Sequence, residues 1–173
     1  MILKLLGLTA IDEERKSSLE KALTNALPEI DERSLRRITG LAGLLGKVAY
    51  ADRDISTDEI KKIEEILRDS THIPEQELEL VTGVVARCTK ELCGIEDHHY
   101  SRLLLESHED KDSRLEILEV LFRVASSDGD ICSEEDYVIG NIATALRLTR
   151  RDFINSRLNF KDYLSVLKNL PEG

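Results

Sequence analysis

The fold is decided by residues 44–67, LLGKVAYADRDISTDEIKKIEEIL, because a second copy, VLFRVASSDGDICSEEDYVIGNIA, follows at residues 120–143. The two copies are identical at nine of 24 aligned positions and lie 76 residues apart. Leu41 and Ile117 extend the apolar face of each copy, so the repeats span residues 41–67 and 117–143. One helix–acidic loop–helix hairpin cannot bury its own apolar face, whereas two packed together can. The repeat therefore predicts two helical hairpins related by a pseudo-two-fold axis.

Helical patterns joined by short connections cover the rest of the chain. The three prolines are widely spaced and no window alternates strictly between apolar and polar residues, so no strand is expected. The helical periods and end signals predict helices near residues 12–26, 31–48, 56–67, 74–92, 96–107, 111–127, 133–147, 150–157 and 161–169. We therefore expect a single compact all-α domain over residues 1–173. It would contain an N-terminal helical segment at 1–30 and a core at 35–157.

Charge and composition exclude several functions. The chain has 24 Lys and Arg against 34 Asp and Glu, a net charge of -10, so it repels phosphate backbones and anionic surfaces unless a local basic patch intervenes. It has no Trp and few other aromatic residues for stacking on single-stranded nucleic acid. A nucleic-acid partner is therefore not expected.

The termini and cysteines point to a cytoplasmic protein. The apolar stretch at residues 1–10, MILKLLGLTA, is too short for a signal peptide or a transmembrane helix. It is either a strip that docks against the core or a weak interfacial anchor. The three cysteines cannot all pair and lack a CxxC spacing, which favours a reducing compartment.

The duplicated acidic loops carry the candidate chemistry. An EF-hand is excluded, because Val48 and Val124 occupy the place of the leading Asp ligand and Arg53 replaces the turn glycine in the first copy. Gly129 fits a left-handed residue just after a helix. Neither loop is therefore an EF-hand.

Helix capping explains part of this acidity. Ser56 and Glu59 have the spacing of a capping box, and Ser133 with Asp136 can act in the same way. Asp52 and Asp128 fall at the ends of the preceding helices, where the helix dipole disfavours them and a counter-ion or basic neighbour would help. Two interpretations remain, which are capping with solvation and a divalent-cation site of oxygen ligands.

The repeated motif, Ala51-Asp52…Ile55…Glu59 and Ser127-Asp128-Gly129…Ile131…Glu135, resembles the TerB-like tellurite-resistance family over roughly residues 35–157. It also resembles the N-terminal region of DjlA-type membrane-tethered J-proteins. The resemblance implies a compact all-helical cytoplasmic fold, no known enzymatic reaction, and a link to tellurite and other chemical stress. It further implies membrane-linked complexes with TerD-like calcium-binding partners. No His-Pro-Asp signature supports a direct chaperone-stimulating role.

The resemblance also implies a metal site. Carried over, the site would use Asp52 and Glu59 from one copy and Asp128 and Glu135 from the other, and Arg53 departs from the family's usual glycine. Asp54 and Asp130 are secondary candidates, and calcium, magnesium or manganese is the expected ion.

No catalytic constellation is recognisable elsewhere. Glu96 and His99 form a single Glu-x-x-His motif, whereas a di-iron bundle needs two, so His98, His99 and Tyr100 are expected to form a polar helix face. The sequence thus favours a non-enzymatic stress-response module that binds a divalent metal. The alternative is a metal-free scaffold whose acidic surface docks a basic or membrane-associated protein.

Overall fold

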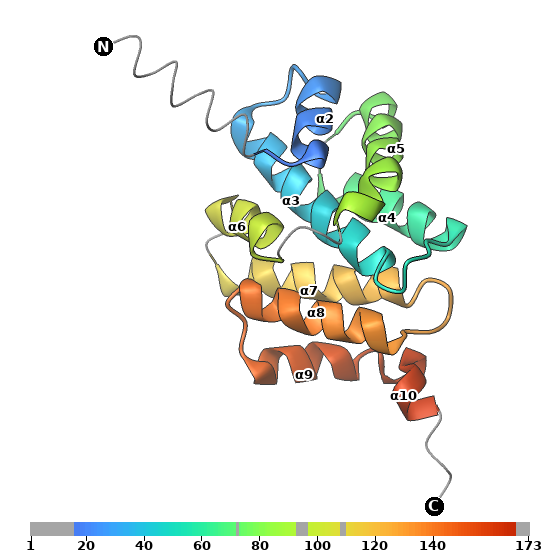
Figure 1. The fold of residues 1–173 in the computed structure, drawn as a ribbon. Helices are drawn as coiled ribbons and strands as arrows, with labels where there is room; N and C mark the ends of the chain where they lie inside the picture. The colour runs from blue at the N-terminus through green and yellow to red at the C-terminus, as the bar shows by residue number, and fades with distance from the viewer. Residues whose placement is uncertain (1–15, 72, 93–96, 108–109, 169–173) are drawn as a thin grey trace, which may run out of the picture.

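The computed structural model describes residues 16–71, 73–92, 97–107 and 110–168, which form nine α-helices and one short 3-10 helix (Figure 1). The elements are α2 (Ser18–Ala26), α3 (Glu32–Ala49), α4 (Thr57–Ser70), α5 (Glu75–Leu92), α6 (Asp97–Ser107), α7 (Lys111–Ala125), α8 (Ser133–Ala145), α9 (Arg150–Leu158), η1 (Lys161–Tyr163) and α10 (Ser165–Lys168). The only β-type pairing among the described residues is an isolated bridge between Ile131 and Leu164. The predicted all-α class is confirmed. None of the described helices is both long and apolar enough to cross a membrane.

Short polar motifs fix where several helices begin. In a capping box, the side chain before the helix accepts a hydrogen bond from an amide three residues later, and that later residue's carboxylate accepts one in return. This reciprocal pair satisfies two backbone donors that no helical carbonyl reaches. Four such pairs open α2, α4, α8 and α9: Ser17–Glu20, Ser56–Glu59, Cys132–Glu135 and Thr149–Asp152. The box predicted at Ser56 is confirmed.

Helix α3 is the centre of the core, and every residue from 38 to 49 is buried. Two of its three glycines, Gly40 and Gly43, let α6 approach closely. A Cβ on Gly43 would clash with the ring of Tyr100, and a Cβ on Gly40 would lie 2.8 Å from Leu104. Tyr100 is completely buried in this contact. The contact between α3 and α6 therefore depends on residues without side chains.

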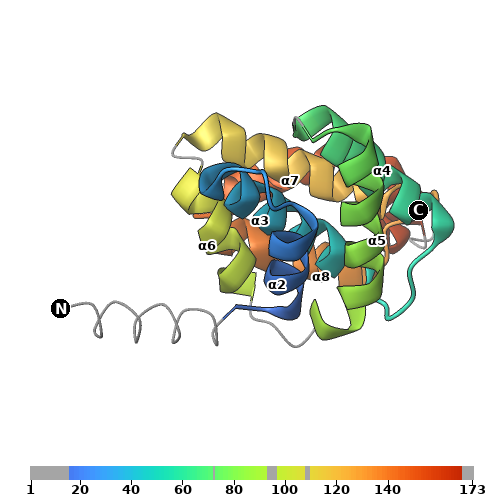
Figure 2. The same cartoon turned by 90° about the horizontal axis from the view of Figure 1, so that it is seen from above.

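The remaining helices lie on both sides of α3. Helices α2 and α5 pack on one side, whereas α7 and α8 pack on the other and α9 lies beyond them (Figures 1 and 2). Each repeat forms one hairpin, α3–α4 and α7–α8, and both acidic loops lie at the same end of the molecule (Figure 1). The pseudo-two-fold axis between the hairpins stays a prediction, as does the single-domain boundary.

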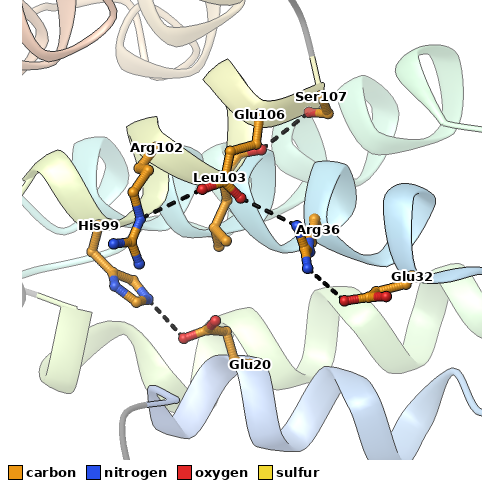
Figure 3. Close-up of polar contacts among 8 residues, drawn as sticks. All are labelled: Glu20, Glu32, Arg36, His99, Arg102, Leu103, Glu106 and Ser107. Carbon is orange, nitrogen blue, oxygen red and sulfur yellow. Dashed lines mark hydrogen bonds and ion pairs between the residues drawn. The ribbon is translucent and has the colours of Figure 1, made fainter. Parts of the chain in front are cut away.

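A polar network attaches α2 to α6 (Figure 3). Nε2 of His99 lies 2.7 Å from Oε2 of Glu20, and the Tyr100 hydroxyl donates to Oγ of Ser17 at 3.2 Å. Burial opposes ionisation of Glu20, but the hydrogen bonds from His99 and the Ser17 amide hold its pKa below the usual value. The predicted polar face is right for His98, which is exposed, and wrong for Tyr100. Helical spacing does not show that α6 turns this side towards α2.

Two terminal predictions have different outcomes. Residues 12–15 of the first predicted helix, and the apolar stretch at 1–10 with both of its interpretations, lie outside the described residues. At the other end, the predicted continuous helix at 161–169 is wrong. The chain forms η1, pairs Leu164 with Ile131, and only then forms α10.

Candidate functional site

The two acidic loops have the same backbone hydrogen bonds. The amide of Ala51 donates to the carbonyl of Val48 and that of Ser127 to Val124, both at 3.0 Å. The next two equivalent bonds run from Arg53 to Tyr50 and from Gly129 to Ser126, both at 3.1 Å. Sequence identity between the copies is therefore accompanied by an equivalent loop conformation.

Asp52 and Asp128 shape these loops. Oδ1 of Asp52 accepts a hydrogen bond from the amide of Asp54 at 2.9 Å, and Oδ1 of Asp128 accepts from Asp130 at 3.0 Å. An aspartate that accepts from an amide two residues later closes a side-chain turn. This role was not predicted from the sequence, although two aspartates spaced two apart in a loop are compatible with it. The second carboxylate oxygen of each aspartate takes no part in this hydrogen bond.

The residue between each pair of aspartates has positive φ. Gly129 has φ 99°, as predicted, and Arg53 adopts φ 74° at the equivalent position. A residue with a Cβ is strained in this region, whereas glycine is not. Val48 and Val124 are fully buried, so neither can serve as the leading ligand of an EF-hand.

Glu59 and Glu135 are buried beneath the loops, with residue exposures of 6% and 7%. Oε2 of Glu59 accepts from the Ser56 amide at 2.7 Å, and Oε2 of Glu135 accepts from the Cys132 amide at 2.8 Å. Helix α8 is thus capped by Cys132, whose sulfur accepts a hydrogen bond from the Glu135 amide at 3.4 Å. The predicted cap by Ser133 and Asp136 is wrong, because Ser133 already lies inside α8.

Asp136 has another partner. Its carboxylate forms two parallel hydrogen bonds with Arg157 of α9, at 2.8 and 2.9 Å.

Burial raises the pKa of the Cys132 thiol to about 12, so the sulfur stays protonated and is a poor metal ligand. The oxygen atoms of the loops are the remaining candidates for ligands.

The four main candidate carboxylates influence one another across the two loops. Burial raises the pKa of Glu59, and the negative charges of Asp128 and Asp52 add to that rise despite the capping hydrogen bonds. Burial likewise raises the pKa of Glu135 to about 7, with further increases from Glu59 and Asp128. Within the described chain, none of these four carboxylates forms an ion pair with Lys, Arg or His. Burial and neighbouring carboxylates therefore both oppose ionisation of the two glutamates.

The secondary candidates differ between the loops. Asp54 is exposed, and its carboxylate accepts from the amide of Ile55 at 3.0 Å. Asp130 instead forms an ion pair at 3.0 Å with Lys168 of α10. No sequence pattern linked Lys168 to the loop, because the two residues are 38 positions apart.

The donor set fits a hard cation in its chemistry, since Ca²⁺, Mg²⁺ and Mn²⁺ favour carboxylate and carbonyl oxygens. The described side chains are not arranged as a ready-made metal centre, because no three His, Cys, Asp or Glu residues among them come together closely enough to hold an ion. A bound ion would require the exposed Asp52 and Asp128 to turn towards it.

Comparison with known proteins identifies a family. A family model described as tellurite resistance protein TerB matches residues 39–158, more than half of the chain. The matched region begins within α3 and ends at the last residue of α9. No curated protein and no solved structure matches.

Proposed function

The chain belongs to the family of the tellurite resistance protein TerB, and we propose that it is a non-enzymatic module of this family whose two acidic loops together bind a divalent cation. The observation that carries the proposal is the raised pKa of Glu59 and Glu135, to which burial contributes most and neighbouring carboxylates add, without a basic ion-pair partner among the described residues. A divalent cation between the loops would offset the charge of these carboxylates and supply the counter-ion that the helix dipoles do not.

The chemistry of the loops narrows the choice of ion. All four main candidates donate oxygen, and the thiol of Cys132 is protonated at neutral pH. This set favours calcium, magnesium or manganese over soft metals. Asp54, Asp130 and the loop carbonyls would complete the coordination. Membership of the family supports a role in tellurite or other chemical stress. The free thiol of Cys132 supports a cytoplasmic location.

Calorimetric titration of the chelator-stripped protein tests this proposal. Calcium, magnesium and manganese should each be added to the wild-type protein and to the double variant Asp52→Asn, Asp128→Asn. We expect saturable binding of at least one ion to the wild type and a loss of affinity of tenfold or more in the double variant.

A matched control uses Asp58→Asn with Glu134→Gln, which removes the same number of charges from exposed positions in the first turns of α4 and α8. This control should bind the ion with wild-type affinity. Absence of binding at millimolar metal, together with unchanged stability in the Asp52 and Asp128 double variant, would contradict the proposal.

A metal-free scaffold is the second candidate. It is favoured by the absence of a preformed metal centre among the described residues and by exposed apolar side chains beside the second loop. Tyr137 of α8 and Val166 of α10 are 71% and 53% exposed and line one hollow of about 210 Å³. An acidic surface with apolar neighbours fits a basic protein partner, including one attached to a membrane.

The two candidates differ in their response to a chelator. An oligolysine peptide should bind the scaffold in the presence of the chelator, and more weakly as salt is raised from 50 to 300 mM. Peptide binding that survives the chelator in a protein that takes up no metal would favour the scaffold. Metal uptake with no peptide binding would favour the cation site.

A further inference from the structure

Helix α9 has one side against the core and leaves another side open to solvent. It packs on α7 and α8 and lies beyond them as seen from α3 (Figure 1). On its outer side Ile154 and Leu158 are 43% and 58% exposed, and their spacing of four residues places them on one face. Six of the seven large apolar side chains exposed in the described chain lie in α8 or beyond it: Tyr137, Ile154, Leu158, Tyr163, Val166 and Leu167. Exposed apolar residues gathered in this way mark interaction surfaces.

A groove of about 580 Å³ runs between α8 and α9. Its lining residues on α8 are spaced at i, i+4, i+7 and i+8 and so share one face of that helix: Asp136, Gly140, Ala143 and Thr144. Phe153 and Ile154 supply apolar lining from α9. At about 1.5 Å per residue, the lining face of α8 is about 12 Å long, which matches two turns of a helix laid along it.

The charges that line the groove are not balanced. Asp136 and Arg157 pair with each other through two hydrogen bonds, at 2.8 and 2.9 Å. Arg150 is the third charged lining residue, and its side chain has no hydrogen bond or ion pair among the described residues. Arg147 and Arg151, on either side of it in sequence, are exposed and likewise have none in the described part of the chain. The groove therefore combines apolar lining with three unpaired guanidinium groups beside the α8–α9 connection.

Fold stability does not explain these three arginines. Arg150 and Arg151 begin α9, and the helix dipole opposes positive charge in the first turn. Arg147 has φ 58°, a left-handed conformation just after α8 that favours glycine over a residue with a Cβ. Positive charge is thus present at positions where it costs stability, as is typical of binding residues.

We propose that the groove between α8 and α9 docks an acidic amphipathic helix of a partner protein. The apolar stripe of such a helix covers Phe153 and Ile154, and its carboxylates pair with the three arginines. The groove attracts the opposite charge from the acidic loops and contains none of the candidate metal ligands. Docking is therefore independent of the proposed cation site.

A lipid surface fits this face less well than a helix does. Polybasic segments that attach to anionic lipids have about four to eight basic residues, whereas the groove offers three unpaired arginines. The net charge of -10 also opposes the approach of an anionic bilayer. A groove between two helices matches the shape of a third helix, and a bilayer is flat.

Fluorescence anisotropy with synthetic peptides tests this proposal on the full chain. The probe is a labelled helix-forming peptide of Leu, Ala and Glu, about 12 residues long, with leucines at i, i+4, i+7 and i+8. A peptide of the same composition in scrambled order keeps the charge and loses the apolar stripe. We expect saturable binding of the probe that weakens as salt is raised, and about tenfold weaker binding of the scrambled peptide. Equal binding of the two peptides, or no binding of the probe, would overturn the proposal.

A pair of double variants tests the arginines. Arg150→Gln with Arg151→Gln is compared with Arg87→Gln and Lys90→Gln, which remove two positive charges from exposed positions on α5, on the other side of α3. We expect the first pair to weaken probe binding about two- to tenfold, the range given by two exposed ion pairs, and the α5 pair to match wild type. An equal loss in both would show a general effect of charge and would overturn the proposal.

Two single variants separate docking from folding. Arg147→Gly relieves the left-handed strain, so the melting temperature should not fall, while probe affinity should fall about two- to fivefold. Ile154→Ser should weaken probe binding about fivefold, whereas Leu80→Ser, at an aliphatic residue of α5 that is 54% exposed, should match wild type. Wild-type affinity in either Arg147→Gly or Ile154→Ser would place the probe elsewhere and overturn the proposal.

Sedimentation with vesicles of phosphatidylcholine and phosphatidylserine, in equal parts, tests the lipid alternative. The protein should remain in the supernatant. Sedimentation with the vesicles that is lost in the Arg150 and Arg151 double variant would assign this face to a membrane and overturn the proposal.

Discussion

Replacing Glu135 with glutamine should stabilise the protein at high pH. Burial and the neighbouring carboxylates raise the pKa of Glu135 to about 7 in the folded protein, from 4.5 without these effects. The folded state therefore binds more protons than the unfolded state between these values, and stability falls as pH rises through this interval. At 1.36 kcal/mol per pKa unit, the full difference is about 3 kcal/mol, an upper limit above pH 7. Glutamine has no charge to bury and can still accept the hydrogen bond from Cys132.

Urea unfolding in the presence of a chelator, at steps from pH 5 to pH 9, measures this effect. We expect Glu135→Gln to exceed wild type by about 1–3 kcal/mol in free energy of unfolding at pH 8 and by much less at pH 5. Glu134→Gln is the control, because it removes one charge from the adjacent exposed position. A variant at 135 that is less stable than wild type at pH 8, or a difference that does not change with pH, would refute the reasoning.

Three further predictions concern the packing, the loop backbone and the metal. Gly43→Ala should lower the free energy of unfolding by about 2 kcal/mol and the melting temperature by roughly 4–8 °C, because its methyl group would meet the Tyr100 ring; an unchanged calorimetric melting curve would contradict this. Gly129→Ala should destabilise the protein by about 1 kcal/mol, whereas Arg53→Gly should stabilise it by about 0.5 kcal/mol. If urea unfolding shows neither effect, positive φ carries no strain at these two positions. Manganese affinity should be about tenfold weaker at pH 6 than at pH 8, because Glu135 must lose its proton to bind, and a pH-independent calorimetric Kd would exclude this residue as a ligand.

Local sequence patterns predicted most of the fold. The 3.6-residue period and the start signals located the helices, and the S-x-x-E spacing identified the capping box of α4. The repeat predicted the two hairpins and the left-handed position of Gly129. Each of these features depends on residues within a few positions of one another, which is why the sequence is sufficient for them.

Non-local contacts could not be predicted in this way. Leu164 pairs with Ile131, 33 positions earlier, and this pairing divides what the helical period had predicted as one continuous helix. The pairing of His99 with Glu20 likewise depends on how α2 packs against α6. One local prediction was also wrong, because Cys132 and not Ser133 caps α8.

The candidate site was predicted as a set of residues and not as a geometry. The duplicated Asp and Glu positions of the sequence become two buried glutamates and two exposed aspartates, and neighbouring carboxylates add to the raised pKa of each glutamate. The alignment of the two sequence copies predicted equivalent roles for the two loops. It gave no information about Lys168, which makes the second loop different from the first.

Paramagnetic relaxation by manganese tests the cation site most directly. Substoichiometric Mn²⁺ is added to the chelator-stripped, ¹⁵N-labelled protein, and the loss of each amide signal is measured. We predict that the amides of both acidic loops, around Asp52 to Asp54 and Asp128 to Asp130, lose intensity first and together, and recover when the chelator is added. Uniform weak broadening, or loss of signals confined to another part of the molecule, would contradict a shared metal site between the loops.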